Sequence, residues 1–96
     1  MKNMTTEDKF QKVIQDTILE IKRQDNKWGA DRDNHPLVWL SIIQEEFGEL
    51  AKEINDADFQ TENLSENYRK ELVQIVAVGL QAIKNYDWFK ANSSEK

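Results

Sequence analysis

The stretch IIQEEFGEL, residues 42–50, places three glutamates between apolar side chains. On a helical wheel, Glu46 and Glu49 lie at the border of the apolar stripe, whereas Glu45 points further out. Glu53 continues the acidic strip one turn later. Carboxylates that crowd together beside a core raise one another's pKa, and burial adds to this effect. The spacing therefore predicts that these acids share a positively charged partner.

A second polar pair interrupts the apolar run from residue 71 to residue 83, where the only polar side chains are Glu71, Gln74 and Gln81. Glu71 and Gln74 are three residues apart, as are Glu46 and Glu49. If the two helices pack antiparallel, both pairs can face one gap. Carboxylate and amide oxygens suit a hard divalent cation, so we expect Mg²⁺, with Mn²⁺ as a possible substitute.

The composition limits the other metal sites. The chain has no cysteine, which excludes thiolate ligands, and its single histidine is in no Glu-x-x-His pair of the kind found in di-iron helical bundles. The plainer alternative is an acidic helix face that is only solvated, with Lys22 or Lys52 as ion-pair partners.

The first element that positions these residues is a helix predicted over residues 5–26. Thr5 and Asp8 form an approximate capping box, and apolar side chains recur every three or four residues after Phe10. Gly29 can end this helix, and the segment 31–34 favours turns.

Two further helices are predicted, over residues 36–55 and 66–86. Pro36 suits the first turn of the second helix. After a polar loop over residues 56–67, either Asn63 with Glu66 or Ser65 alone can cap the third helix. The third helix is apolar on most of its circumference, which predicts dimerisation or a higher homo-oligomer through this helix. We expect residues 90–96 to be disordered.

The length and charge of the chain limit its domain number, fold class and partners. The 96 residues predict a single domain, residues 1–96, and three glycines with one proline predict an all-α helical bundle of three to four helices. The net charge of −5 argues against binding to a nucleic acid polymer. The chain has neither a signal-peptide pattern nor a run of 18 apolar residues, so we expect a cytoplasmic protein without a membrane partner.

The acidic motif resembles a known family. EEFGEL followed by ELVQ at residues 71–74 is similar to the E-E-x-x-E … E-x-x-D signature of the all-α nucleoside triphosphate pyrophosphohydrolases, the MazG-like proteins and the related dCTP pyrophosphatases. The segment HPLVWLSIIQEEFGELAKEI resembles the second helix of that family over its whole length. The resemblance covers roughly residues 28–84 and departs from the family pattern at Gln74, which replaces the final Asp.

The resemblance implies an all-helical dimer or tetramer that uses Mg²⁺ to cleave nucleoside triphosphates into nucleoside monophosphate and pyrophosphate. By position, it implies metal ligation by Glu46, Glu49, Glu71 and Gln74. It further implies that Glu45 or Glu49 positions or deprotonates the attacking water. Gln74 can coordinate through its amide oxygen but adds no charge, which predicts weaker metal affinity and a lower catalytic rate.

The same resemblance directs attention to side chains that could bind the substrate. Lys52, Arg69 and Lys70 are candidates for the β- and γ-phosphates, although such side chains are more often only solvated. Trp28 and Trp39 could each stack on a nucleobase, although Trp39 also suits the core. His35 has two interpretations, a residue that starts a helix or a substrate contact, since the related pyrophosphatases carry a similar histidine near their pocket.

Three functions remain open from the sequence. The first is a Mg²⁺-dependent pyrophosphohydrolase that clears surplus or non-standard nucleotides. The second is a nucleotide-binding or regulatory helical dimer that has lost catalysis through Gln74. The third is a structural helical dimer with solvated acids.

Overall fold

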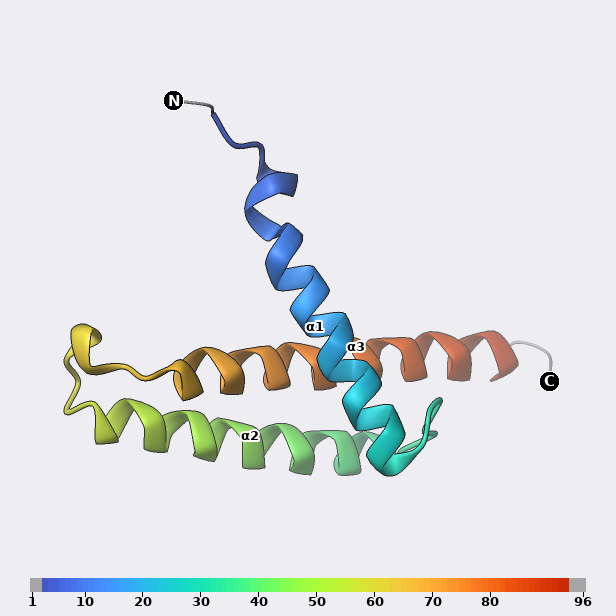
Figure 1. The fold of residues 1–96 in the computed structure, drawn as a ribbon. Coiled ribbons are helices and arrows are strands. Elements are labelled where there is room, and N and C mark those ends of the chain that lie inside the picture. The colour runs from blue at the N-terminus through green and yellow to red at the C-terminus, as the bar shows by residue number, and fades with distance from the viewer. Residues whose placement is uncertain (1–2, 94–96) are drawn as a thin grey trace.

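The chain folds into three long helices (Figure 1). The structure is a computed structural model that describes residues 3–93, and these residues contain no β-strand. This confirms the predicted all-α class.

Helix α1, Thr6–Trp28, has both of the ends expected from the sequence. At its start, the Asp8 amide donates to Thr5 Oγ1 and the Thr5 amide donates to an Asp8 carboxylate oxygen, both at 3.1 Å. At its end, Gly29 adopts a φ of 95°, in the region that favours glycine, and its amide donates to the Asp25 carbonyl at 2.8 Å.

Helix α2 spans Pro36–Asp56 and helix α3 spans Glu66–Ser93, with the 3₁₀ helix η1, Thr61–Asn63, between them. Ser65 fixes the start of α3, because its hydroxyl accepts from the Asn67 amide at 3.2 Å and donates to Glu53 of α2 at 3.1 Å. The link to Glu53 ties the start of α3 to the end of α2.

Helix α3 continues past the end expected near Tyr86. No glycine or proline follows Tyr86 to stop it, the Lys90 ammonium lies 5.8 Å from the Tyr86 ring centre, and the Asn92 side chain donates to the Trp88 carbonyl at 2.8 Å. Residues 90–93, which we expected to be disordered, are therefore helical, and residues 94–96 lie outside the described residues.

Helices α2 and α3 lie side by side and antiparallel, and α1 crosses α3 (Figure 1). Helix α3 is thus the element on which both of the others pack. The buried apolar core is small and consists of Trp39, Ala57, Ala77 and Val78. Four polar side chains are buried as well: Thr17, Gln24, Gln81 and Asn85. None of the helices within residues 3–93 has the length and apolar character needed to cross a membrane.

Candidate functional site

Glu46 of α2 meets the Glu71–Gln74 pair of α3 between the two antiparallel helices, whereas Glu49, the other member of the predicted α2 pair, stays exposed. The Gln74 amide group lies 2.9 Å from Glu46 Oε2 and 2.9 Å from Glu71 Oε2. With its nitrogen turned toward them, Gln74 donates a hydrogen bond to each carboxylate. All three side chains are half-buried, in contrast to Glu45 and Glu49, which are exposed.

The electrostatics of this cluster centre on Glu46. Burial, followed by a hydrogen bond and charge repulsion from Glu71, raises the pKa of Glu46 to about 7. The negative charges of Glu49 and Glu20 act in the same direction. A cation between the two carboxylates would relieve the charge repulsion that contributes to this raised pKa.

The cluster is smaller than the predicted set of four ligands. Among residues 3–93, no three histidine, cysteine, aspartate or glutamate side chains come together closely enough to hold a metal ion. Glu46 and Glu71 converge with the neutral Gln74, while Glu49 contributes its charge from the exposed side. Two carboxylates and one amide oxygen still form a donor set suited to Mg²⁺, which commonly keeps several waters and takes other oxygens from phosphates.

Helix α1 brings a further carboxylate toward the cluster, which the motif comparison missed. Glu20 accepts two hydrogen bonds from Arg23, at 2.9 and 2.6 Å, and one from Gln24 at 2.8 Å. Thr17, Glu20 and Gln24 recur at helical spacing, but they stand among many other polar residues of α1, so this spacing alone does not mark the face. In the structure, Thr17 and Gln24 are buried and Glu20 is half-buried.

The third polar residue of the apolar α3 run, Gln81, faces α1. Its amide nitrogen donates to Gln24 at 2.5 Å and to the Ala77 carbonyl at 3.1 Å, and its oxygen accepts from Arg32 at 2.7 Å. A continuous set of hydrogen bonds thus runs from Arg32 through Gln81 and Gln24 to Glu20. It fixes the crossing of α1 over α3 because each buried amide would be left unpaired if α1 shifted.

The aromatic candidates lie at the other end of the α2–α3 pair. Trp39 is only 6% exposed and its indole nitrogen donates to Asn85 at 2.8 Å, so it packs in the core. His35 caps α2, since its Nδ1 accepts from the Leu37 amide at 3.1 Å. Both side chains also line a cavity of about 670 Å³, together with Tyr86 and Phe89. A substrate contact by Trp39 or His35 in this cavity therefore stays a prediction.

Trp28 is exposed, and cations already lie near its ring. The Lys27 ammonium lies 4.5 Å and the Arg32 guanidinium 5.6 Å from the ring centre. Arg32 also lies 5.4 Å from the Trp39 ring centre, which joins the loop to the core.

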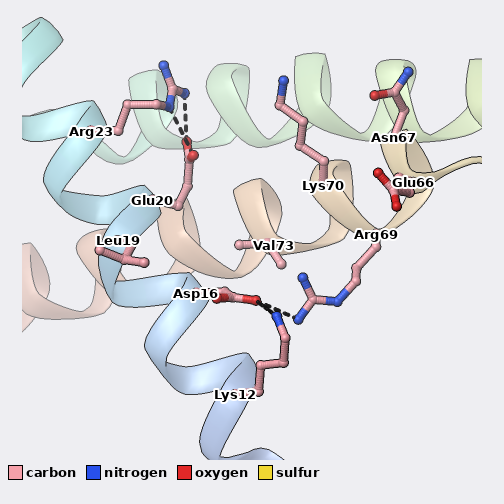
Figure 2. Close-up of a pocket in the computed structure, with 10 residues that line it drawn as sticks. All are labelled: Lys12, Asp16, Leu19, Glu20, Arg23, Glu66, Asn67, Arg69, Lys70 and Val73. Carbon is pink, nitrogen blue, oxygen red and sulfur yellow. Dashed lines mark hydrogen bonds and ion pairs between the residues drawn. The ribbon is translucent and has the colours of Figure 1, made fainter.

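The basic candidates separate into two groups. Arg69 and Lys70 line a cavity between α1 and the start of α3 (Figure 2). Lys52 is exposed on α2 and does not line this cavity.

Comparison of the chain with family models, with curated proteins and with solved structures finds no match.

Proposed function

We propose that this chain is a Mg²⁺-dependent nucleoside triphosphate pyrophosphohydrolase that converts a nucleoside triphosphate and water to the monophosphate and pyrophosphate. The observation that carries this proposal is the meeting of Glu46, Glu71 and Gln74 from two antiparallel helices. These are positions at which the sequence resembles the metal-binding motif of the MazG-like family. The raised pKa of Glu46 supports a site that favours a cation.

In this proposal, Glu46, Glu71 and the amide oxygen of Gln74 would hold Mg²⁺, with Mn²⁺ as a substitute. The ion would neutralise charge on the phosphoryl oxygens and on the departing pyrophosphate. Glu49 and Glu45 are exposed beside the cluster on the same helix, where a carboxylate could orient or deprotonate water. Side chains around the cluster would hold the parts of the substrate that the metal ion does not contact.

The alternative is a nucleotide-binding or regulatory protein without turnover, and Gln74 is the observation that favours it. An amide can complete a metal site through its oxygen, yet it cannot accept a proton from water as a carboxylate does. The two functions share the same ligand and differ only in product formation.

The deciding experiment incubates the full chain with Mg²⁺ and a panel of canonical and modified nucleoside triphosphates, with separate assays for pyrophosphate and orthophosphate. Glu71→Gln removes one charge from the cluster at constant size, and Glu62→Gln is the matched control on the exposed η1 turn. We expect pyrophosphate release that Glu71→Gln abolishes and Glu62→Gln preserves.

Release that survives in both variants would contradict the proposal, since a contaminating enzyme would then be the source. Thermal stabilisation by Mg²⁺ and a nucleotide, with no product from any substrate, would establish the binding protein instead.

We further propose that the active form is a homodimer or homotetramer. The accessible surface of the chain is 7695 Å². About 5,700 Å² is typical of a compact monomer of the same mass. Apolar side chains remain exposed along α3: Leu72, Val76, Leu80 and Ile83. A second copy is the simplest partner that could cover this stripe.

A further inference from the structure

A basic cavity lies between α1 and the start of α3, beside the acidic cluster (Figure 2). Its volume is about 720 Å³. Two cations come from α1, Lys12 and Arg23, and two from α3, Arg69 and Lys70. The cavity lined by Trp39 and His35, by contrast, has no lysine or arginine in its lining.

Three carboxylates, Asp16, Glu20 and Glu66, line the cavity with these four cations, which leaves one positive charge in excess. Asp16 alone accepts from two of them, Lys12 at 2.8 Å and Arg69 at 2.9 Å. Glu20 pairs with Arg23 at 2.6 Å. Within residues 3–93, Lys70 makes no ion pair, although its charge acts on Glu20, and Figure 2 shows its side chain extending away from the ion pairs at Asp16.

The cations are within reach of a ligand from solvent. The side chains of Arg23 and Arg69 are each 50% exposed although both are paired. A guanidinium presents donors in a planar fork and can bind a phosphate through two hydrogen bonds. Arg69 and Lys70 also lie in the first turns of α3, where the helix dipole favours an anion.

The cavity and the acidic cluster are next to each other. Glu20 lines the cavity, and its charge contributes to the raised pKa of Glu46. The hydrogen bond that Arg23 donates to Glu20, and the negative charges of Glu20 and Glu46, raise the pKa of Arg23. Lys70 directly precedes Glu71 on α3.

We propose that this cavity binds the β- and γ-phosphates of the substrate, with α1 supplying half of the cationic side chains. This inference rests on the proposed function, because it places the two terminal phosphates beside the carboxylates that would act on the α-phosphorus. It predicts a substrate with a polyphosphate tail, and Asp16 competes with that tail for Lys12 and Arg69.

The test measures binding of inorganic tripolyphosphate and of orthophosphate by calorimetry, in EDTA and again in Mg²⁺. The variants Arg69→Ala and Lys70→Ala each remove a cation, and Asp16→Asn removes the competing charge. The matched controls are Lys84→Ala and Asp31→Asn, which break a similar exposed ion pair of 3.0 Å between a later part of α3 and the loop that precedes α2.

We expect tripolyphosphate to bind more tightly than orthophosphate. Arg69→Ala and Lys70→Ala should each weaken tripolyphosphate binding about tenfold, the usual effect of losing one charged hydrogen bond. Asp16→Asn should strengthen it, and both controls should bind as the wild type does. Equal binding of the two anions, or equal effects of Arg69→Ala and Lys84→Ala, would overturn the inference.

Failure of the proposed function would look different. Glu71→Gln should lose pyrophosphate release and still bind tripolyphosphate in EDTA. If no nucleotide is hydrolysed while the cavity variants lose tripolyphosphate, the enzyme proposal fails and the polyphosphate site stands. If hydrolysis depends on Glu71 but Arg69→Ala and Lys70→Ala leave the KM for the nucleotide unchanged, the enzyme proposal is supported and the cavity proposal fails.

Discussion

At the scale of single residues, Gln74 sets the charge of the acidic cluster. It sits 2.9 Å from two carboxylates, and as a neutral donor it can satisfy both of them without a cation. With a carboxylate in place of the Gln74 amide, the three carboxylates would repel one another in the absence of a metal ion. If the cluster binds Mg²⁺ as proposed, Gln74 would exchange metal affinity for stability of the metal-free protein, because the amide can turn its nitrogen or its oxygen toward the neighbouring side chains.

Gln74→Glu tests this exchange at constant side-chain length. In EDTA, the added carboxylate should destabilise the fold, and a cost of about 1 kcal/mol would lower the melting temperature by about 4–8 °C. In Mg²⁺ the order should reverse, with metal affinity higher by about tenfold, or about 1.4 kcal/mol. Melting curves with and without Mg²⁺ measure both. A variant that is equally destabilised in the two conditions would show that Gln74 has no role in cation binding.

Glu46 predicts an unusual pH dependence of stability. Its pKa is about 7 in the folded chain, against 4.5 for an ordinary glutamate. Between these values the folded state binds more protons than the unfolded state, so the free energy of unfolding falls as pH rises. The stabilising contribution is complete below 4.5 and is lost as pH passes through about 7.

Urea unfolding in EDTA, at fixed protein concentration and at pH values from about 5 to about 8, measures this slope. Glu46→Gln cannot titrate and should flatten it, whereas Glu62→Gln on the exposed η1 turn should not. Equal slopes in the two variants would show that other groups control the pH dependence.

At the scale of helices, the sequence predicted the packing of α2 on α3 but not the role of α1. The acids of α2 and α3 stand out because Glu71 and Gln74 interrupt an apolar run, and the antiparallel packing follows from a short connection. On α1, Glu20 and Gln24 stand among many other polar residues, so periodicity alone does not mark them. Which amide pairs with Gln81 depends on the crossing of α1 over α3, a tertiary property without a local signal.

The Gln24–Gln81 pair should matter for this crossing. Gln81→Leu leaves the Gln24 oxygen and Arg32 without their partner, and a buried unsatisfied group costs about 1–3 kcal/mol. The double variant Gln24→Leu/Gln81→Leu should recover part of the loss, since apolar groups then face each other. Gln11→Leu, an exposed position on α1, is the control. Chemical denaturation measures the wild type, the single variants Gln24→Leu and Gln81→Leu, the double variant and the control, and additive losses in the double variant would contradict a direct pairing.

At the scale of the whole molecule, the fold is extended. The radius of gyration is 16.3 Å and the principal extents are 53 × 36 × 22 Å. A compact chain of this length has a radius of gyration of about 12.5 Å. The first half of α1 projects away from the α2–α3 pair (Figure 1), and its apolar residues Phe10 and Ile14 are more than half exposed. The apolar stripe that periodicity predicted on α1 thus lacks a complete partner within the described part of the chain.

This surface predicts that the isolated chain assembles. Its area exceeds that of a compact monomer by about 2,000 Å², more than the roughly 800 Å² that each partner buries in a stable interface. Sedimentation equilibrium should give at least twice the chain mass of 11.3 kDa. Leu80→Arg places a charge in the exposed α3 stripe and should dissociate the assembly and lower its stability, because α3 would lose its second packing surface.

Asp87→Arg, an exposed polar position on the same helix, controls for the added charge and should assemble normally. A wild-type chain that remains a stable monomer at high concentration would contradict the prediction. The pyrophosphate release of the dissociated variant shows whether the acidic cluster needs the second copy. If Leu80→Arg loses pyrophosphate release while its monomer keeps helical content, the acidic site depends on the second copy for the position of α3. If the monomer is active, the second copy contributes stability alone.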